Sequence, residues 1–195
     1  MDTDDARLIS KYCKVGKIVL KKLERFLDRI IDFVGLISAV LLILMILVVA
    51  YDVFARYLFH NSSIAMQELE WHFFATMMLF GTGYALKEEA HVRVDFLYDR
   101  LSYKKKALIN IFGTILFLIP LSLLIIYGSY DFVKDAYDVN EISEDPGGLK
   151  YRWIIKGMIP LSFIFLILCG IEYIIKNINI YRGEERAKEI NEDML

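Results

Sequence analysis

Histidine, cysteine and acidic side chains are the residues that could do chemistry in this chain, and their spacing supports little of it. The histidines are His60, His72 and His91, and the cysteines are Cys13 and Cys169. Only His72 falls inside an apolar segment, whereas a di-haem bundle needs histidine ligands well inside two helices. The sequence has no HExxH or CxxC motif, and no spacing that suggests a Ser-His-Asp set. We therefore expect no catalytic residue, no metal site and no bound cofactor, so the chain is not expected to be an enzyme.

Charged residues gather where two apolar segments meet. Arg56 follows the first segment, and Glu68, Glu70 and Trp71 lie in the first turns of the second. Acidic groups at a membrane helix end are costly unless they find a cation or reach the lipid headgroups. Two interpretations stay open: an ion pair of Arg56 with Glu68 or Glu70 that pins the two helices together, or snorkelling of the acidic side chains to headgroups. Arg56 can also pair with Asp52, four residues earlier on the same helix face.

The composition indicates that a membrane surrounds these residues. Of the 195 residues, 56% are hydrophobic, and the 25% that are charged stand in blocks between long apolar runs. Soluble domains have about 45–50% apolar residues. Four runs reach the length of roughly 20 residues that a bilayer crossing takes. The predicted fold is an all-α integral membrane protein with four transmembrane helices, at about residues 30–54, 64–86, 108–130 and 154–175.

The segments that flank the four-span membrane domain, residues 30–177, are polar. In residues 1–29, apolar side chains recur at three- and four-residue steps and basic side chains fill the remainder. This pattern predicts a basic amphipathic helix at the membrane interface. Residues 178–195 are predicted to be a charged cytoplasmic tail. Within the spans, Ser62 or Ser63 can cap the second helix, and Pro120 predicts a kink in the third.

Lysine and arginine placement predicts the orientation. Of the 23 basic residues, 18 fall in residues 1–29, in the connection 87–107 or after residue 175. Basic residues favour the cytoplasmic side of a membrane. Both termini are therefore predicted to be cytoplasmic, and the acidic segment 131–153 is predicted to be an outer loop. The formal net charge of −2 gives no indication of nucleic-acid binding.

Several short motifs follow one another along the chain. Their residues, in chain order, are Arg56, Glu68, Glu70, Trp71, His91, Arg93, Asp95, Glu141 and Lys156. In this order the motifs resemble those of a known family, the small membrane subunit (DctQ-type small permease component) of tripartite ATP-independent periplasmic (TRAP) transporters. Glu141 and Lys156, with their neighbours, are similar to its mannitol/chloroaromatic-type branch. The resemblance covers residues 30–175.

The resemblance implies a role in solute uptake across the bacterial inner membrane. A large elevator-type membrane subunit would carry out sodium-driven transport of an organic acid or related solute, which an extracytoplasmic substrate-binding protein delivers. This chain would be the scaffold for that subunit, would hold no sodium or substrate itself, and would use the residues named above at interfaces or for lipid binding.

Two alternative functions of other classes stay open. One is a membrane-anchor subunit of a redox enzyme that binds haem or quinone. The other is a small self-contained transporter that works as an oligomer, although the chain shows no internal repeat and no cluster of ionisable residues at mid-membrane.

Overall fold

The computed structural model describes residues 3–61, 63–90 and 101–182, with side chains from Leu20 onward. All regular structure in these residues is helical. The elements are α1 (Thr3–Phe59), α2 (Ile64–Lys87), α4 (Tyr103–Gly113), the π-helical turn η1 (Thr114–Leu118), α5 (Ile119–Asp138) and α6 (Trp153–Tyr181). The described part of the chain is therefore all-α, as the sequence predicts.

The first helix is longer than predicted. α1 is one uninterrupted helix of 57 residues, so the basic amphipathic segment and the first span are not separate elements. No proline interrupts the sequence between them, and helix propagation continues wherever each new residue can add a backbone hydrogen bond. Contact of this segment with lipid headgroups stays a prediction.

Three helical stretches are long and apolar enough to cross a membrane: Leu20–Phe59, Tyr103–Asp138 and Trp153–Tyr181. α2 has 24 residues but is not among them, because polar side chains occupy its first turns. The sequence predicted an acidic loop from residue 131, and this prediction is wrong in its first part, since α5 continues to Asp138. Apolar content marks where lipid can lie, and a helix continues past it as long as its backbone hydrogen bonds continue.

Pro120 is accommodated by a widened helical turn. Proline has no N–H group, and its ring clashes with the carbonyl group four residues earlier in a regular α-helix. η1 lies immediately before Pro120, and the Ile119 amide donates to the carbonyl of Thr114, five residues earlier. Such π-helical turns are single insertions in longer helices. Residues 103–138 are therefore helical throughout, and the wider turn η1 lets the helix continue through Pro120.

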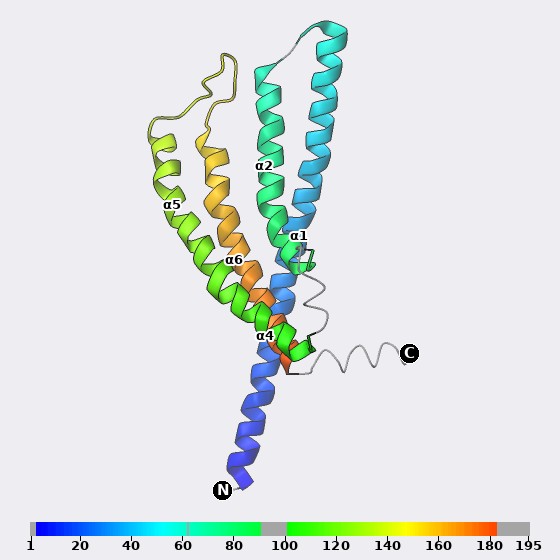
Figure 1. Cartoon of the computed structure of the whole chain (residues 1–195), viewed down its shortest axis with the longest axis vertical. Coiled ribbons are helices and arrows are strands. Elements are labelled where there is room, and N and C mark those ends of the chain that lie inside the picture. The colour runs from blue at the N-terminus through cyan, green and yellow to red at the C-terminus, as the bar shows by residue number, and fades with distance from the viewer. Residues whose placement is uncertain (1–2, 62, 91–100, 183–195) are drawn as a thin grey trace.

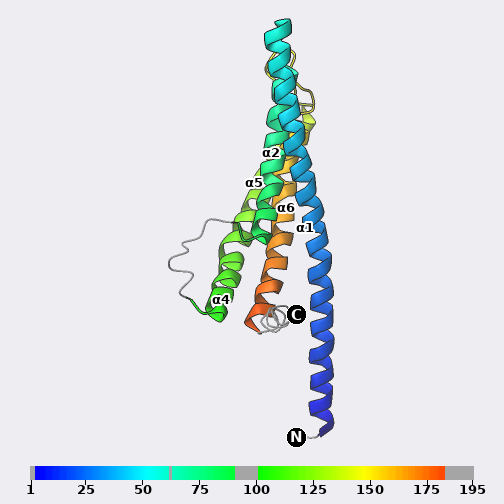
Figure 2. The same cartoon turned by 90° about the vertical axis from the view of Figure 1, so that its right-hand side faces the viewer.

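The helices form a flattened layer in which α1, α2, α6 and α5 lie side by side in that order (Figures 1 and 2). The buried apolar cluster consists of Ile31, Leu86, Phe165, Cys169 and Tyr173. Leu86 lies in the last turn of α2, and the α6 members extend from the middle of that helix toward its C-terminus, so the core lies toward the end of the bundle at which α2 ends.

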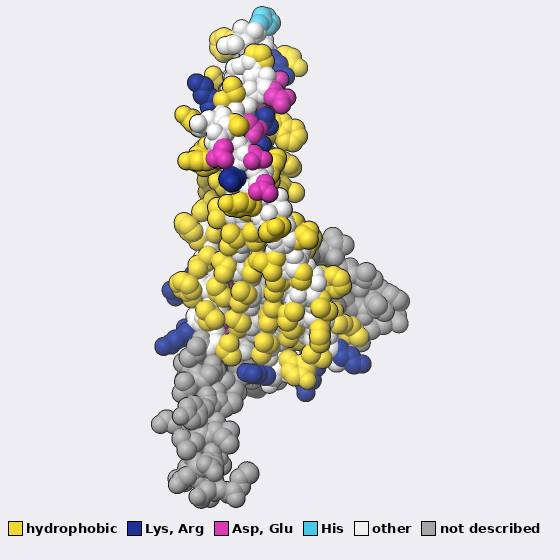
Figure 3. Space-filling model, turned by 90° about the vertical axis from the view of Figure 1, so that its left-hand side faces the viewer, with side chains coloured by type: hydrophobic (Ala, Val, Ile, Leu, Met, Phe, Trp, Pro, Cys, Tyr) yellow, Lys and Arg dark blue, Asp and Glu magenta, His cyan; other side chains and the backbone are white. Residues whose placement is uncertain are grey.

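Large apolar side chains also face outward. Phe117 is 75% exposed and Tyr127 is 86% exposed, and most of the large apolar residues of α1 are exposed as well. The side of the molecule shown in Figure 3 has an apolar band, with acidic and some basic side chains toward one end and basic side chains along the other. Helices that are apolar on every side are typical of membrane spans.

Small residues bring the helices close together. Ser122, Ser129 and Ala136 are buried in α5 at seven-residue steps, and α5 packs along α6. Ser122 donates its hydroxyl to the Leu118 carbonyl of its own helix at 2.7 Å, so the residue contributes small size and not an interhelical hydrogen bond. Close approach of small residues is a common way for membrane helices to associate.

The two glycines in the C-terminal half of α2, Gly81 and Gly83, differ in their surroundings. A Cβ atom on Gly83 would lie 2.6 Å from the Phe165 ring and 3.0 Å from the Cys169 sulfur, whereas a Cβ atom on Gly81 would have no neighbour within 4 Å. Gly83 therefore sits at the contact between α2 and α6, and Gly81 faces open space.

We expect Gly83→Ala to lower the free energy of unfolding by about 1–3 kcal/mol, because an added methyl group overpacks the contact with α6. Gly81→Ala is the matched control and should be neutral or stabilising by up to about 1 kcal/mol, since alanine favours helix more than glycine does. Denaturant titration of the purified protein in detergent measures both. Equal destabilisation by the two substitutions would contradict the assignment.

Candidate functional site

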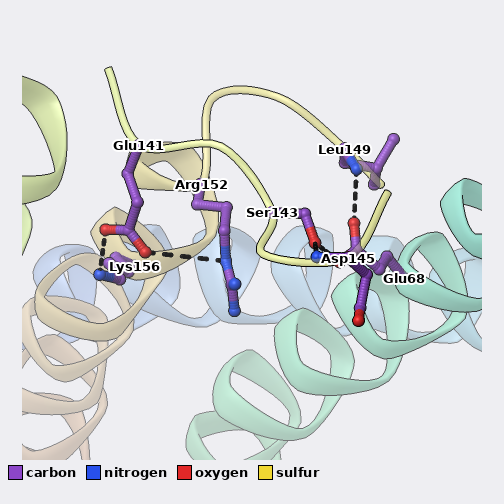
Figure 4. Close-up of polar contacts among 7 residues, drawn as sticks. All are labelled: Glu68, Glu141, Ser143, Asp145, Leu149, Arg152 and Lys156. Carbon is purple, nitrogen blue, oxygen red and sulfur yellow. Dashed lines mark hydrogen bonds and ion pairs between the residues drawn. The ribbon is translucent and has the colours of Figure 1, made fainter. Parts of the chain in front are cut away.

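Glu68 binds a distant loop of the chain. Its side chain, in the second turn of α2, points toward the connection between α5 and α6 (Figure 4). One carboxylate oxygen accepts a hydrogen bond from the Ser143 hydroxyl, and the other accepts one from the Leu149 backbone N–H. Hydrogen bonds to an ionised acceptor are roughly twice as strong as neutral ones. A single side chain of α2 therefore fastens the outer loop, which we define as residues 139–152.

A tight turn carries the outer loop past Glu68. In the Asp-Pro-Gly-Gly segment 145–148, the Gly148 amide donates to the carbonyl three residues earlier at 3.0 Å, and Gly147 has a φ of 89°. Proline followed by a glycine with positive φ is typical of a type II turn. A Cβ atom on Gly148 would lie 2.4 Å from Ser143 Cβ and 2.8 Å from Glu68 Oε2, so only glycine fits there.

The start of the outer loop is set by the way α5 ends. Asn140 has a φ of 48°, and its amide donates to the Tyr137 carbonyl at 3.1 Å. The Glu141 amide donates to the Ala136 carbonyl at 2.9 Å. These two bonds form a Schellman motif, with asparagine in the left-handed conformation that it tolerates better than most residues.

Glu141 and Lys156, which the resemblance singled out together, contact each other. The Glu141 carboxylate pairs with the Lys156 ammonium group and lies 3.8 Å from Nε of Arg152 (Figure 4). The Arg152 amide also donates to the Glu141 carbonyl at 3.0 Å. Lys156 Nζ is 4.1 Å from the centre of the Phe132 ring on α5, within reach of a cation–π interaction. Both ends of the outer loop are thus tied to α5 and α6.

Arg56 pairs with Asp52 on its own helix. Its guanidinium contacts the Asp52 carboxylate one turn earlier, and Asp52 is only 4% exposed. The pairing of Arg56 with Asp52 is thus the one observed, and no direct contact of Arg56 with Glu68 or Glu70 is present among the described residues. The reason is that Asp52 is fixed on the same helix face, whereas Glu68 faces the outer loop. Glu70 is half-buried and lies close enough to the Arg56–Asp52 pair to interact electrostatically with both charges, and Trp71 is 71% exposed.

The other residues singled out by the sequence lie at the start of α2 or outside the described residues. Ser63 occupies the N-cap position of α2 but makes no side-chain cap bond, and its carbonyl accepts two amides of the first turn instead. Ser62 and the resemblance residues His91, Arg93 and Asp95 lie outside the residues that the structure describes.

A second set of polar contacts joins the helices at the opposite end of the bundle. The Lys87 ammonium group at the end of α2 contacts Asp32 of α1 at 2.5 Å and Asp28 at 3.3 Å. The sequence analysis did not predict this contact. The fact that Asp32 is charged within an apolar run was the available signal. Two amide contacts lie at the same end: Asn179 to Glu24 at 2.8 Å, and Asn110 to Asn177 at 2.9 Å.

Of the groups that could do chemistry, Cys169 and Glu172 lie one turn apart on α6, and His72 lies on α2. Cys169 is buried in the apolar core, and the His72 ring nitrogen lies 2.5 Å from the Glu68 backbone carbonyl of its own helix. Glu172 is 1% exposed, and one of its oxygens has no hydrogen-bond partner. Among the described residues, no group of three or more His, Cys, Asp or Glu is arranged to hold a metal ion.

Comparison with known proteins gives concordant matches. The family model described as "Tripartite ATP-independent periplasmic transporters, DctQ component" matches residues 45–179, which include the outer loop, Glu68 and Lys156. A putative TRAP transporter small permease protein of Haemophilus influenzae is 25% identical over 147 residues, which is 75% of this chain and 86% of the relative.

Two further relatives are named for sialic acid. The sialic acid TRAP transporter small permease protein SiaQ of Vibrio cholerae is 22% identical over 164 residues, which is 84% of this chain and 90% of SiaQ. The sialic acid TRAP transporter permease protein SiaT of Haemophilus influenzae is 23% identical over 115 residues. That match covers 59% of this chain and only 18% of SiaT.

We expect Glu68→Ala to release the outer loop, because the Leu149 amide loses its acceptor. Loss of one charge-assisted hydrogen bond should speed hydrogen exchange at Leu149 by roughly tenfold. Glu70→Ala is the matched control on the same helix and should leave that exchange unchanged. Hydrogen exchange followed by mass spectrometry makes the comparison, and unaltered protection of the loop in Glu68→Ala would contradict the contact.

We expect the Glu141–Lys156 pair to couple energetically. In a double-mutant cycle of Glu141→Gln and Lys156→Gln, the coupling free energy should be about 1 kcal/mol, as for other partly exposed ion pairs. Denaturant unfolding in detergent measures it. Simple additivity of the two substitutions would show that the pair makes no net contribution.

Proposed function

Because the chain belongs to the DctQ-component family of tripartite ATP-independent periplasmic transporters, we propose that it is the static scaffold against which the large membrane subunit of such a transporter works. The chain is a multi-pass protein of the bacterial inner membrane. Its family is that of a transporter component and not of an enzyme, and the redox-anchor alternative is not favoured.

The observation that supports this proposal is that polar contacts lie at the two ends of the bundle, whereas apolar side chains cover the outward faces between them. Polar contacts at the two ends of the bundle hold neighbouring helices to one another, through Glu68 at one end and Lys87 at the other. Between these ends, the outward faces of α1 and α5 are apolar and exposed. A scaffold needs helices that keep their spacing and an apolar surface on which a membrane partner can pack.

The transport chemistry is proposed to belong to the partners. The large subunit would bind sodium and the solute and move the solute inward by an elevator motion, and an extracytoplasmic binding protein would deliver it. Two relatives are named for sialic acid, which carries a carboxylate, and this supports an organic acid as the class of solute. We propose that this chain binds no cofactor, and the resemblance to the mannitol/chloroaromatic-type branch does not fix the solute.

α2 is proposed to be the fourth membrane crossing. Its 24 residues rise roughly 36 Å, compared with a hydrocarbon thickness of roughly 30 Å. The hydrogen bonds that Glu68 accepts from the outer loop reduce the cost of a carboxylate near the membrane boundary. In this arrangement the outer loop faces the periplasm, and both termini are cytoplasmic.

The test is co-expression of this chain with the large permease subunit from the same genome, followed by purification and uptake of labelled organic acids into proteoliposomes. We expect a stable complex, and uptake only when both chains and the binding protein are present. In Glu68→Ala the released loop should weaken assembly of the complex by about 1.4 kcal/mol, which corresponds to a loss of roughly tenfold in uptake. Glu70→Ala should transport as wild type does.

Two results would contradict the proposal. Uptake by proteoliposomes that hold this chain alone would make it a transporter in its own right. A Soret band in the visible spectrum of the purified protein would instead support the haem-binding alternative.

A further inference from the structure

Three basic side chains follow one face of α1 near the end of the bundle that carries the N-terminus. Lys22, Arg25 and Arg29 succeed one another at three- and four-residue steps, so they share a helix face. Phe26 lies in the same stripe and is 61% exposed. We call these four exposed residues the α1 basic stripe.

The opposite face of this part of α1 packs against the bundle. Leu27 and Ile31 are 7% and 1% exposed, and the acidic side chains on that face contact Lys87 and Asn179 from α2 and α6. The acidic groups on this face are thus used within the chain, while Lys22, Arg25 and Arg29 are exposed on the other face.

The basic groups of the stripe have no acidic partner within the described part of the chain. Arg25 Nε donates to the Lys21 carbonyl of its own helix at 3.3 Å, and that bond leaves its charge uncompensated. Of the described residues, the four members of the stripe line a shallow hollow of about 160 Å³. An anion that entered this hollow would meet two guanidinium groups and one ammonium group.

The same helix face becomes apolar directly beyond the stripe. Phe33, Leu36 and Val40 continue from Arg29 at four-, three- and four-residue steps, and they are 63%, 61% and 46% exposed. The surface therefore changes from cationic to apolar within about two helical turns, in the direction of the span predicted at residues 30–54. This is the order of chemical groups along a phospholipid, from phosphate to acyl chain.

We propose that the α1 basic stripe binds the phosphate headgroup of an anionic phospholipid, with the acyl chains along Phe33, Leu36 and Val40. Charge complementarity favours this occupant, because guanidinium groups match phosphate oxygens in a bidentate geometry and a zwitterionic lipid brings its own cation. An aromatic side chain such as Phe26 lies comfortably at the boundary between headgroup and hydrocarbon. The proposal does not depend on which partner subunit the chain has.

Native mass spectrometry of the full-length purified chain tests the proposal, with dioleoylphosphatidylglycerol and dioleoylphosphatidylcholine as the two probes. We expect a preference for phosphatidylglycerol. Since each basic residue near an anionic lipid contributes roughly fivefold, the combined variant Lys22→Gln, Arg25→Gln, Arg29→Gln should weaken phosphatidylglycerol binding on the order of 100-fold. Binding should also weaken as salt is raised.

Two further variants keep the result interpretable. Lys104→Gln, Lys105→Gln, Lys106→Gln removes the same number of charges from α4, at the same end of the bundle, and should weaken binding by less than about fivefold. Lys22→Arg, Arg25→Lys, Arg29→Lys keeps the charges and should retain binding, which also shows that the stripe tolerates substitution.

Three outcomes would overturn the proposal. One is equal binding of the two lipids by the wild-type chain. Another is an equal loss of phosphatidylglycerol binding in the α1 and α4 variants, which would indicate general attraction to basic residues and no particular site. The third is unchanged lipid binding in the α1 variant together with weaker association with the large subunit, which would assign the stripe to a protein partner.

Discussion

The carboxylate of Glu68 holds the bundle together where side-chain packing contributes least. α6 has no buried residue before Ser162, and the buried residues of α2 are Gly83 and Leu86, near its C-terminus. The outer halves of both helices therefore have little core between them. In this region Glu68 accepts hydrogen bonds from Ser143 and Leu149, and so joins α2 to the loop that connects α5 and α6.

That contact depends on several local features of the loop at once. The left-handed Asn140 ends α5, the Pro-Gly-Gly segment reverses the chain, and the absence of a side chain at Gly148 lets the backbone approach Glu68. A carboxylate near a membrane boundary is costly unless its oxygens are satisfied, and hydrogen bonds are stronger where water is scarce. The contact therefore forms only when the end of α5, the Pro-Gly-Gly turn and the ionised Glu68 are all present.

Sequence reasoning located the apolar segments, the outer loop and the family, because each of these leaves a signal in residue type and spacing. The same signals placed the helix ends too early: Asp131 to Asp138 are polar in part, yet they remain helical until Asn140 caps them. Hydropathy reports where lipid can lie, whereas a helix ends where its backbone hydrogen bonds end.

The partner of Glu68 was beyond prediction for a different reason. One of its two donors is the backbone N–H of Leu149, 81 residues away in the sequence, and nearly every residue carries such a group. Residue identity therefore could not single out Leu149, and charge alone suggested Arg56 as one candidate partner of Glu68. Pro120 shows the same limit of sequence-based prediction. A proline within a helix predicts a disturbance, but it does not predict the π-helical turn that accommodates the residue.

A flattened layer of helices sets the conditions under which these polar contacts matter. Within lipid, burial of apolar surface gives helices little reason to prefer one another, because the acyl chains are equally apolar. Small residues such as Gly83 and Ser122 permit close approach, but specific neighbours must be chosen by groups that lipid cannot satisfy. Glu68 at one end of the layer and Lys87 at the other are such groups, and each binds an element that is distant in sequence. The middle of the layer is then free to remain apolar on its outward faces, which is the property that a membrane scaffold requires of its surface.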